Sequence, residues 1–426
     1  MSTQSIPAGV SASARESWKN TILAGLANYI DAGSIVAGAA ALTLWAERYH
    51  LSARFLGLIG AFSANAIAAG VGALIGGYLC DRFGRKKVYQ YDMLFYAFGM
   101  SWLVFALQPW MILLGFILVG LAVGADIPAS WSLIAETAPE GKRGERSGVT
   151  QVLWLLGPFV VVLMSFLLAP LGLFGARVVF THLLILALLL TLLRSRMRES
   201  PLWLAANKKK NEDSGNTSLF QVNRLRKLLQ PRYLRAITFL VGMYGIWNLC
   251  VGTFGFFFPY ILRTIGGQSQ TVVMGLQAGG ALLSIASLVF IFMRLVDRVD
   301  HRSLLGLSFL LQIGGLSLFA LFPLTTPVAI LFLLLTALSS LGMPQAFYQL
   351  WSAELFPTLV RGTAQGITFA IVRIGLGVWS FYVPLLVSTR FTTLVWVLVG
   401  FLALSGMIGV TWAPRNVGKA LEQIED

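Results

Sequence analysis

The sequence has little charge, few cysteines and few histidines. Only 12% of its 426 residues are charged, whereas 57% are hydrophobic, and the mean hydropathy is +0.76. This composition excludes an ordinary water-soluble domain and indicates a membrane protein. The two cysteines, Cys80 and Cys250, fall in or beside apolar stretches, so we expect small core residues rather than a disulfide framework.

Patterns that carry enzyme chemistry are also missing. The three histidines, His50, His182 and His301, have no metal-ligand spacing. No catalytic triad or cofactor fingerprint is present, and the glycine-rich stretches have no Walker lysine. We therefore expect no enzyme, no metal site and no cofactor. His182 could relay protons within an apolar stretch, although a buried imidazole with satisfied hydrogen bonds is the simpler interpretation.

Long hydrophobic runs are what the sequence has in abundance. Roughly 20 apolar residues cross a ~30 Å hydrocarbon layer as a helix, and an outer-membrane barrel would show short alternating strands instead. The polar first 19 residues lack the apolar core of a secretory signal, so the first run is expected to be a retained helix. An all-α fold is predicted, with twelve transmembrane spans near 20–46, 54–80, 88–107, 110–135, 148–170, 174–194, 233–262, 271–296, 303–323, 327–353, 362–386 and 390–412.

The net charge of +14 comes from basic residues that gather on one side of the predicted spans. If both termini are cytoplasmic, 26 of the 32 Lys and Arg lie on the cytoplasmic side and one, Arg373, lies inside a span. Such a bias fixes orientation and predicts an inner or plasma membrane protein with both termini in the cytoplasm. The cations then face lipid and cytoplasm, which argues against a nucleic-acid partner. The opposite side carries five: Arg48, Arg54, Arg177, Arg263 and Arg390.

A polar stretch divides the twelve spans into two matched halves. We expect an N-terminal bundle over 1–194, a cytoplasmic linker over 195–232 and a C-terminal bundle over 233–426. "DRFGRK" at 81–86 is echoed by "DRVDHR" 216 residues later, and "ETAPEGKRG" at 136–144 by "ELFPTLVRG" 218 residues later. Two signatures with nearly one offset predict a duplicated six-helix unit in parallel orientation.

Charges and glycines at the cytoplasmic ends of these spans predict a gate between the bundles. Exposed ion pairs contribute only ~0–1 kcal/mol each, which suits contacts that must open. Alternatively, the basic residues only anchor short loops to lipid headgroups. Asp92, ~7 Å beyond Lys87, is assigned to the gate by depth. The predicted gate residues are Gly77, Asp81, Arg82, Gly84, Arg85, Asp92, Glu136, Arg143, Asp297, Arg298, Glu354 and Arg361.

At these motifs the sequence resembles the major facilitator superfamily. The run from Gly77 to Lys86, Gly-x-x-x-Asp-Arg-x-Gly-Arg-Lys, matches its signature between the second and third spans. The two Glu-x-x-Pro-x-x-x-Arg-Gly loops, and "RESPLWL" at 198–204, resemble its sugar porter and metabolite:proton symporter branch. The resemblance implies alternating access around a site near the membrane midplane. Gln151 fits that branch, whereas Gly115 replaces a typical arginine and "VGMYGIWNLCVG" lacks the usual glutamine pair.

Three charged residues lie deep within predicted spans, where a charge costs at least ~2.5–3.5 kcal/mol and indicates function. Helical rise places Asp31 and Asp126 ~15 Å, and Arg373 ~18 Å, from the helix ends. The segment around Asp31 resembles the symporters' proton-coupling helix, so Asp31 is predicted to alternate between protonated and arginine-paired forms, with a fixed ion pair as the alternative. Asp126 is predicted either to couple protons or to be structural. Arg373 either binds a substrate carboxylate or, preferably, neutralises one of the aspartates.

Neutral polar and aromatic residues in the spans could bind a polyhydroxylated ligand, although helix–helix hydrogen bonding is an equal alternative for each. The predicted function is a proton-coupled symporter that imports a sugar, polyol or sugar acid and works as a monomer. A drug:proton antiporter and a non-transporting sensor on the same scaffold are the alternatives. The substrate-site candidates besides Arg373 are Gln151, Asn248, Gln345, Asn28, Trp154 and Trp379.

Overall fold

The structure is a computed structural model in which each predicted span is one helix or a run of consecutive helices. In the described part of the chain every regular element is helical. The twelve-span all-α fold is therefore confirmed. The described residues are 14–51, 53–62, 66–139, 142–197, 199–200, 202–205, 207–208, 228–268, 270–296, 298–342 and 344–413.

The first six spans form the N-terminal bundle. Its helices are α1 (Ala14–Tyr49), α2 (Ala53–Phe62), α3 (Ile67–Phe83), α4 (Arg85–Val104), α5 (Pro109–Thr137), α6 (Arg143–Leu167), the short 3-10 helix η1 (Ala169–Leu171) and α7 (Gly172–Ser195). The second span is thus made of α2 and α3 together. Pro128 and Pro158 lie inside α5 and α6, where the missing N–H group favours a bend.

The last six spans form the C-terminal bundle. Three of them are interrupted by π or 3-10 turns, so they are runs of short helices. The elements are α10 (Pro231–Leu240), the π turn η2 (Val241–Gly245), α11 (Ile246–Thr264), α12 (Gln270–Ser287), the π turn η3 (Leu288–Phe292), α13 (Met293–Leu295), α14 (His301–Leu321), α15 (Thr326–Leu338), the 3-10 turn η4 (Ser339–Gly342), α16 (Pro344–Glu354), α17 (Arg361–Thr389) and α18 (Phe391–Trp412).

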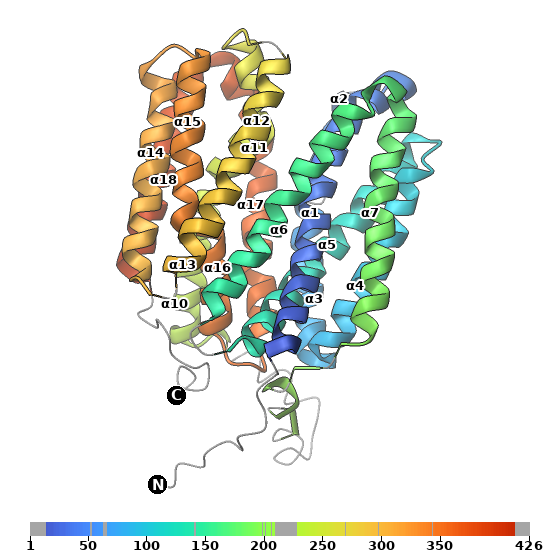
Figure 1. The fold of residues 1–426 in the computed structure, drawn as a ribbon, viewed down its shortest axis with the longest axis vertical. Helices are drawn as coiled ribbons and strands as arrows, with labels where there is room; N and C mark the ends of the chain where they lie inside the picture. The colour runs from blue at the N-terminus through green and yellow to red at the C-terminus, as the bar shows by residue number, and fades with distance from the viewer. Residues whose placement is uncertain are drawn as a thin grey trace.

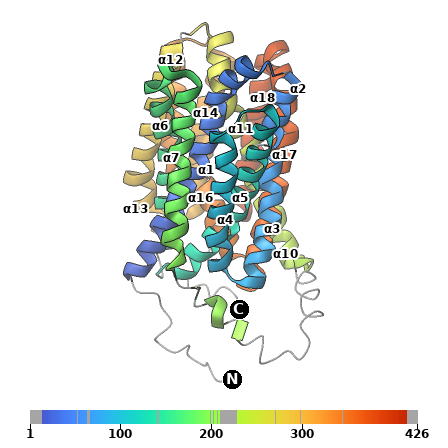
Figure 2. The same ribbon diagram turned by 90° about the vertical axis from the view of Figure 1, so that its right-hand side faces the viewer.

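The two bundles stand side by side with their helices running along the long axis of the molecule (Figures 1 and 2). They come together at the end where α3 turns into α4 and α17 begins, and they move apart toward the end that carries α2 (Figure 1). We call these the converging end and the diverging end. In the described residues, seven helical stretches are long and apolar enough to span a membrane on composition alone. The other spans carry charges such as Asp31 and Arg373, or are broken by turns.

Glycines let α3 and α5 pack with their backbones almost in contact. A Cβ atom on Gly72 would lie 2.1 Å from the carbonyl oxygen of Leu121, and one on Gly124 would lie 2.0 Å from that of Ala69. Both distances are far below van der Waals contact. Small residues at helix interfaces permit this close approach in membranes, and here it fixes the position of the α3 end that reaches the other bundle.

This packing predicts that Gly124→Ala destabilises the protein by about 1–3 kcal/mol, because the added methyl group overpacks a backbone contact. The matched control is Gly400→Ala in α18, where a Cβ atom would meet nothing within 4 Å. Thermal unfolding in detergent, followed by tryptophan fluorescence, measures both. Equal melting temperatures for the two variants would contradict the close contact.

Candidate functional site

The bundles are joined most directly where α3 meets the first turn of α17. The Asp81 carboxylate accepts hydrogen bonds from the backbone N–H groups of Gly362 and Thr363, at 3.1 and 2.7 Å. N–H groups in the first turn have no partner within their own helix. A Cβ atom on Gly77 would lie 2.2 Å from the carbonyl oxygen of Gly362, so glycine is required there. Asp81 therefore caps a helix of the opposite bundle.

Buried ion pairs surround this cap. Arg85 pairs with Asp81 at 3.2 Å and with Glu136 at 3.1 Å, and Glu136 pairs with Arg361 of the C-terminal bundle at 2.6 Å. Arg85 also donates to the carbonyl oxygen of Thr358. We call Asp81, Arg85, Glu136 and Arg361 the interbundle network; it contains two acids and two arginines.

The energetic expectation for the gate was wrong, because its pairs are buried rather than exposed. The side chains of Arg85, Glu136 and Arg361 are 0% exposed. Water cannot stabilise a charge that loses its partner there, so removing one member of such a pair costs about 3–5 kcal/mol. The interbundle network is accordingly a stronger contact than the sequence predicts.

Two other predicted gate residues, Arg82 and Arg298, form no hydrogen bond or ion pair with the interbundle network in the described part of the chain. Arg82 is exposed and donates to the hydroxyl group of Tyr78 at 3.2 Å, although it stands next to Asp81 in the sequence. Arg298 is also exposed, and Glu354 is buried at the end of α16. Two predicted residues lie outside the described positions: the side chain of Arg143, and Asp297.

Glu199, just after α7, belongs to the "RESPLWL" motif, and the structure gives it a contact that the sequence did not predict. Its carboxylate accepts hydrogen bonds from the backbone N–H groups of Arg85 at 3.0 Å and Lys86 at 3.1 Å, which caps the start of α4. Gly84 has a φ of 98°, and a Cβ atom there would lie 2.1 Å from Glu199. The Trp203 indole donates to the carbonyl oxygen of Asp81 at 3.4 Å. The segment after α7 is thus docked on the α3–α4 turn.

A second charged group lies within the N-terminal bundle. Arg194 Nη1 is 2.8 Å from Asp126 Oδ1 and 3.0 Å from Asp92 Oδ1. The guanidinium group lies over the Tyr89 ring, 3.4 Å from its centroid. All three charged side chains are buried. Asp92 therefore belongs to this cluster and not to the gate, because helical rise gives the depth of a residue but not the direction in which it faces.

Arg194 is a buried charged residue that the sequence analysis did not single out. It stands at the boundary between an apolar run and the polar linker, where it counts as one more cytoplasmic cation. In the structure Arg194 lies in the last turn of α7, and its buried side chain forms an ion pair with Asp126. Asp126 is thus paired with Arg194, while the predicted partner Arg373 interacts electrostatically with the other candidate, Asp31.

Asp31 lies in the middle of α1 and is 3% exposed. Both of its carboxylate oxygens are buried, and neither has a hydrogen-bond partner among the described residues. It interacts electrostatically with Asp126, Arg194 and Arg373. Both predicted proton-coupling residues, Asp31 and Asp126, therefore point into the protein rather than toward lipid.

Polar side chains link the bundles near mid-depth. Gln151 of α6 donates to Gln349 Oε1 of α16 at 3.0 Å, and Gln345 is buried one turn earlier on α16. Asn28 of α1 donates to the carbonyl oxygen of Thr150 at 3.4 Å. In the described residues Gln151 Oε1 and Gln349 Nε2 have no further partner, so this bridge retains one free acceptor and one free donor.

Aromatic rings line the same interface. Trp131 of α5 meets Tyr348 and Phe369 edge to face, with ring centroids 5.4 and 6.0 Å apart. Tyr348 stacks on Tyr244 at 4.1 Å. The Arg373 guanidinium lies over Phe369, 4.6 Å from its centroid. Trp131 and Tyr348 add to the predicted set, since nothing in their spacing separates them from other aromatic residues of the spans.

The remaining predicted substrate residues lie in α6, α11 and α17. Arg373 Nη1 donates to Asn248 Oδ1 at 3.5 Å, so these two residues are brought together. Trp379 donates to the Thr253 hydroxyl group at 2.9 Å. Trp154 is half-buried on α6. Most of the predicted polar residues thus face the interior, while Trp379 is engaged within its own bundle.

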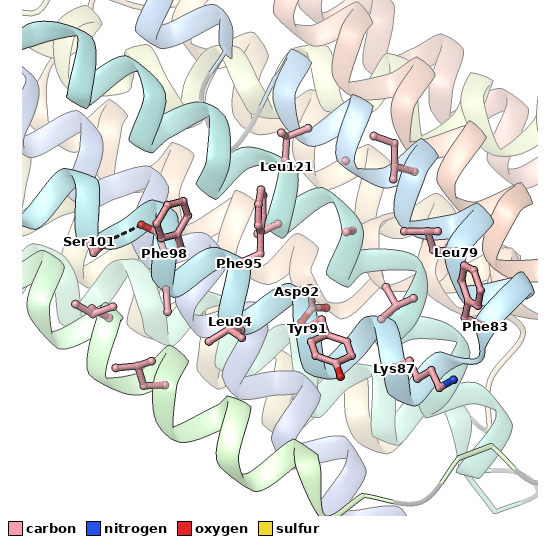
Figure 3. Close-up of a pocket in the computed structure, with 18 residues that line it drawn as sticks. Leu79, Phe83, Lys87, Tyr91, Asp92, Leu94, Phe95, Phe98, Ser101 and Leu121 are labelled. Atoms are coloured by element: carbon pink, nitrogen blue, oxygen red, sulfur yellow. Dashed lines mark hydrogen bonds between the residues drawn. The ribbon is translucent and has the colours of Figure 1, made fainter.

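A groove of about 1140 Å³ lies on the outer side of the N-terminal bundle, away from this interface. Residues of α3, α4, α5 and α7 line it, and Figure 3 shows rings such as Phe95 and Tyr91 along its wall. Lys87, Asp92 and Ser101 are among its few polar contributors. Such a lining suits hydrocarbon chains rather than a sugar.

Two six-span bundles that meet at buried ion pairs and enclose polar and charged side chains define a secondary transporter of the two-bundle class. Residues 21–380 match the sequence model of the Major Facilitator Superfamily. The chain belongs to that superfamily, as its motifs predict, and is a membrane transporter rather than an enzyme.

Named relatives agree with this membership. The chain is 43% identical over 409 residues to the minor myo-inositol transporter IolF of Bacillus subtilis, covering 96% of this chain and 93% of the relative. It is 24% identical to the glucose transporter GlcP of Staphylococcus epidermidis, over 85% of this chain and 86% of that one. Among solved structures, the proton:xylose symporter XylE bound to 6-bromo-6-deoxy-D-glucose has a TM-score of 0.83 at 18% identity, over 97% of this chain and 99% of that one.

The interbundle network predicts that Glu136→Gln opens the converging end. The substitution leaves Arg85 and Arg361 without the carboxylate that both of them bind. Breaking a buried ion pair costs about 3–5 kcal/mol, which is enough to invert a two-state equilibrium. Spin labels at Lys142→Cys and Arg298→Cys lie on opposite bundles. Double electron–electron resonance should show a longer distance between the two labels in the Glu136→Gln variant.

The matched control for this experiment is Arg82→Gln, which removes an exposed charge beside the network. We expect it to leave the label-to-label distance unchanged. The native Cys80 and Cys250 are buried, so they should not take up label. The same distance distribution in Glu136→Gln and Arg82→Gln would show that the buried pairs do not hold this end closed.

Proposed function

We propose that this chain is a proton-coupled symporter that imports a neutral cyclic polyol of the inositol class. The observation that carries the proposal is its 43% identity, over 96% of its length, to a protein named as a myo-inositol transporter. The departures from the sugar-porter pattern at Gly115 and in "VGMYGIWNLCVG" are consistent with a substrate other than a simple hexose.

The interface between the bundles offers suitable chemistry for such a ligand. Among the described residues, the buried atoms Gln151 Oε1, Gln349 Nε2, Trp131 Nε1 and Tyr244 OH have no hydrogen-bond partner. Hydroxyl groups both donate and accept, so a polyol can satisfy donors and acceptors together. Aromatic faces from Trp131 and Tyr348 supply apolar contact for a ring. Few precisely placed polar groups among aromatic residues are typical of small-molecule sites.

Asp31 supports proton coupling. A carboxylate that is buried without hydrogen bonds has its charged form disfavoured, so it takes up a proton readily. A nearby arginine favours the charged form instead. We propose that the balance between Arg194, Arg373 and the proton changes as the bundles rock, which links protonation to the conformational equilibrium.

The orientation and direction of transport follow from the distribution of charge. With both termini cytoplasmic, the converging end faces the cytoplasm and the diverging end faces outward. The structure then represents an outward-facing state, into which substrate and proton enter together. A negative interior favours proton entry by ~2.3 kcal/mol per 100 mV. We place the protein in the inner or plasma membrane as a functional monomer.

Uptake of radiolabelled myo-inositol by proteoliposomes tests this function. We expect accumulation when the lumen is alkaline relative to the medium and none when the gradient is reversed. Unlabelled cyclic polyols should compete, whereas sugar acids should not. Accumulation only with an acidic lumen would indicate an antiporter. Absence of uptake and of competition for every polyol would refute the proposed substrate class.

Asp31→Asn is expected to uncouple transport from the proton gradient. The isosteric amide cannot bind and release a proton, so the lumenal concentration should rise no higher than the external one. Exchange of labelled for unlabelled substrate across the membrane should persist, since it needs no net proton movement. Asp300→Asn, at an exposed residue that caps α14, is the control. Retained accumulation in Asp31→Asn would exclude Asp31 as the coupling residue.

A further inference from the structure

Asp92 and Asp126 are bound to the same nitrogen atom of Arg194. The Nη1 to Oδ1 distances are 3.0 Å for Asp92 and 2.8 Å for Asp126. The two carboxyl groups also interact directly with each other. Asp92 is 5% exposed and Asp126 0%, while Arg194 is 1% exposed. The three side chains come from α4, α5 and α7 and form one compact group inside the bundle.

The charges of this group do not balance if every member is ionised. Two carboxylates face one guanidinium group; of the neighbouring groups, Tyr89 carries no charge, and Asp31 adds a third acid that interacts with Arg373 as well as with Arg194. In the described residues the outer oxygens Oδ2 of Asp92 and Asp126 are buried and have no hydrogen-bond donor. An uncompensated charge in such a place is strongly disfavoured.

Solvent does not relieve this imbalance. On its outer side Asp92 borders the groove of Figure 3, whose lining is mostly apolar and includes the exposed Lys87. Lipid chains rather than water are the natural contents of that groove in a membrane. The groove therefore offers the Asp92 carboxyl group little hydration.

We propose that Asp92 and Asp126 share a single proton, and that this shared proton keeps Arg194 neutralised so that Asp31 remains free to bind and release the coupling proton. Like-charged carboxyl groups held together commonly retain one proton between them. With one proton, the pair carries a single negative charge, which Arg194 balances. The last step, the effect on Asp31, rests on the proton coupling proposed above.

Infrared spectra of the purified protein in lipid nanodiscs at neutral pH test the shared proton without any transport. In an Asp31→Asn background, which removes the signal of the coupling carboxyl group, the C=O stretch of a protonated carboxyl group should lose the same intensity in Asp92→Asn and in Asp126→Asn. The double variant should remove no more intensity than either single variant. The exposed control Asp300→Asn should leave the band in place.

The Arg194→Gln variant should change the intensity of the infrared band in the opposite direction. Without the guanidinium group neither carboxylate is balanced, so both should take up a proton and the band should grow. Because Arg194 also packs on Tyr89, this variant could fail to fold; the isosteric Asp92→Asn and Asp126→Asn variants then decide the matter. A band that persists in both single variants, or losses that add in the double variant, would overturn the shared proton.

Transport assays test the link to Asp31 separately. In Asp92→Asn the carboxylate of Asp126 still balances Arg194, so proton-driven uptake should stay close to wild type. In the double variant Arg194 has no counter-charge and should hold Asp31 ionised, which lowers proton-driven uptake by roughly a hundredfold. Uptake loss in Asp92→Asn, with its infrared intensity already gone, would refute the role toward Asp31 while leaving the shared proton established. Absence of transport in the wild type would refute only the proposed function.

Discussion

The carboxylate of Asp81 at the first turn of α17 is the contact on which the arrangement of the two bundles depends. It binds N–H groups that the helix cannot satisfy itself, at the end where the helix dipole favours a negative charge. The contact is possible only because Gly77 and Gly362 let the two backbones approach. Arg85, Glu136 and Arg361 then assemble around it, so the closed end is built outward from a helix cap.

The two buried groups of charged residues in this protein differ in their charge balance. The interbundle network has two acids and two arginines, so it needs no proton, and its strength depends on both bundles being in place. The group around Arg194 lies within one bundle and has more acids than arginines. Charge balance thus separates the contact between the bundles from the group that we propose to share a proton, although both consist of the same residue types.

Much of the architecture could be predicted because the membrane limits the choices. Hydrophobic runs gave the twelve spans, and two repeated loop signatures gave the halves. The direction in which each single side chain points could not be predicted. Arg82 and Arg85 stand in one motif, yet a glycine with positive φ between them turns one outward and the other into the core.

The same limit applies within the spans. Asp92 and Arg194 are far apart in sequence, and each lies near the end of an apolar run, so only the packing of α4 against α7 brings them together. The sequence likewise could not predict that the ion pairs are buried, because their burial results from contact between the two bundles. Trp131 became recognisable only through its contacts, and the capping role of Glu199 only through its hydrogen bonds.

The docking of Glu199 on the start of α4 changes how the connection between the halves should be regarded. The chain that leaves α7 is fastened to the N-terminal bundle beside the interbundle network, so the first part of the connection between the halves belongs to that bundle. Two surfaces carried by one chain face each other at a high effective concentration. In the transport cycle proposed above, closing this end is therefore an intramolecular encounter, and it can be rapid even after the ion pairs have separated.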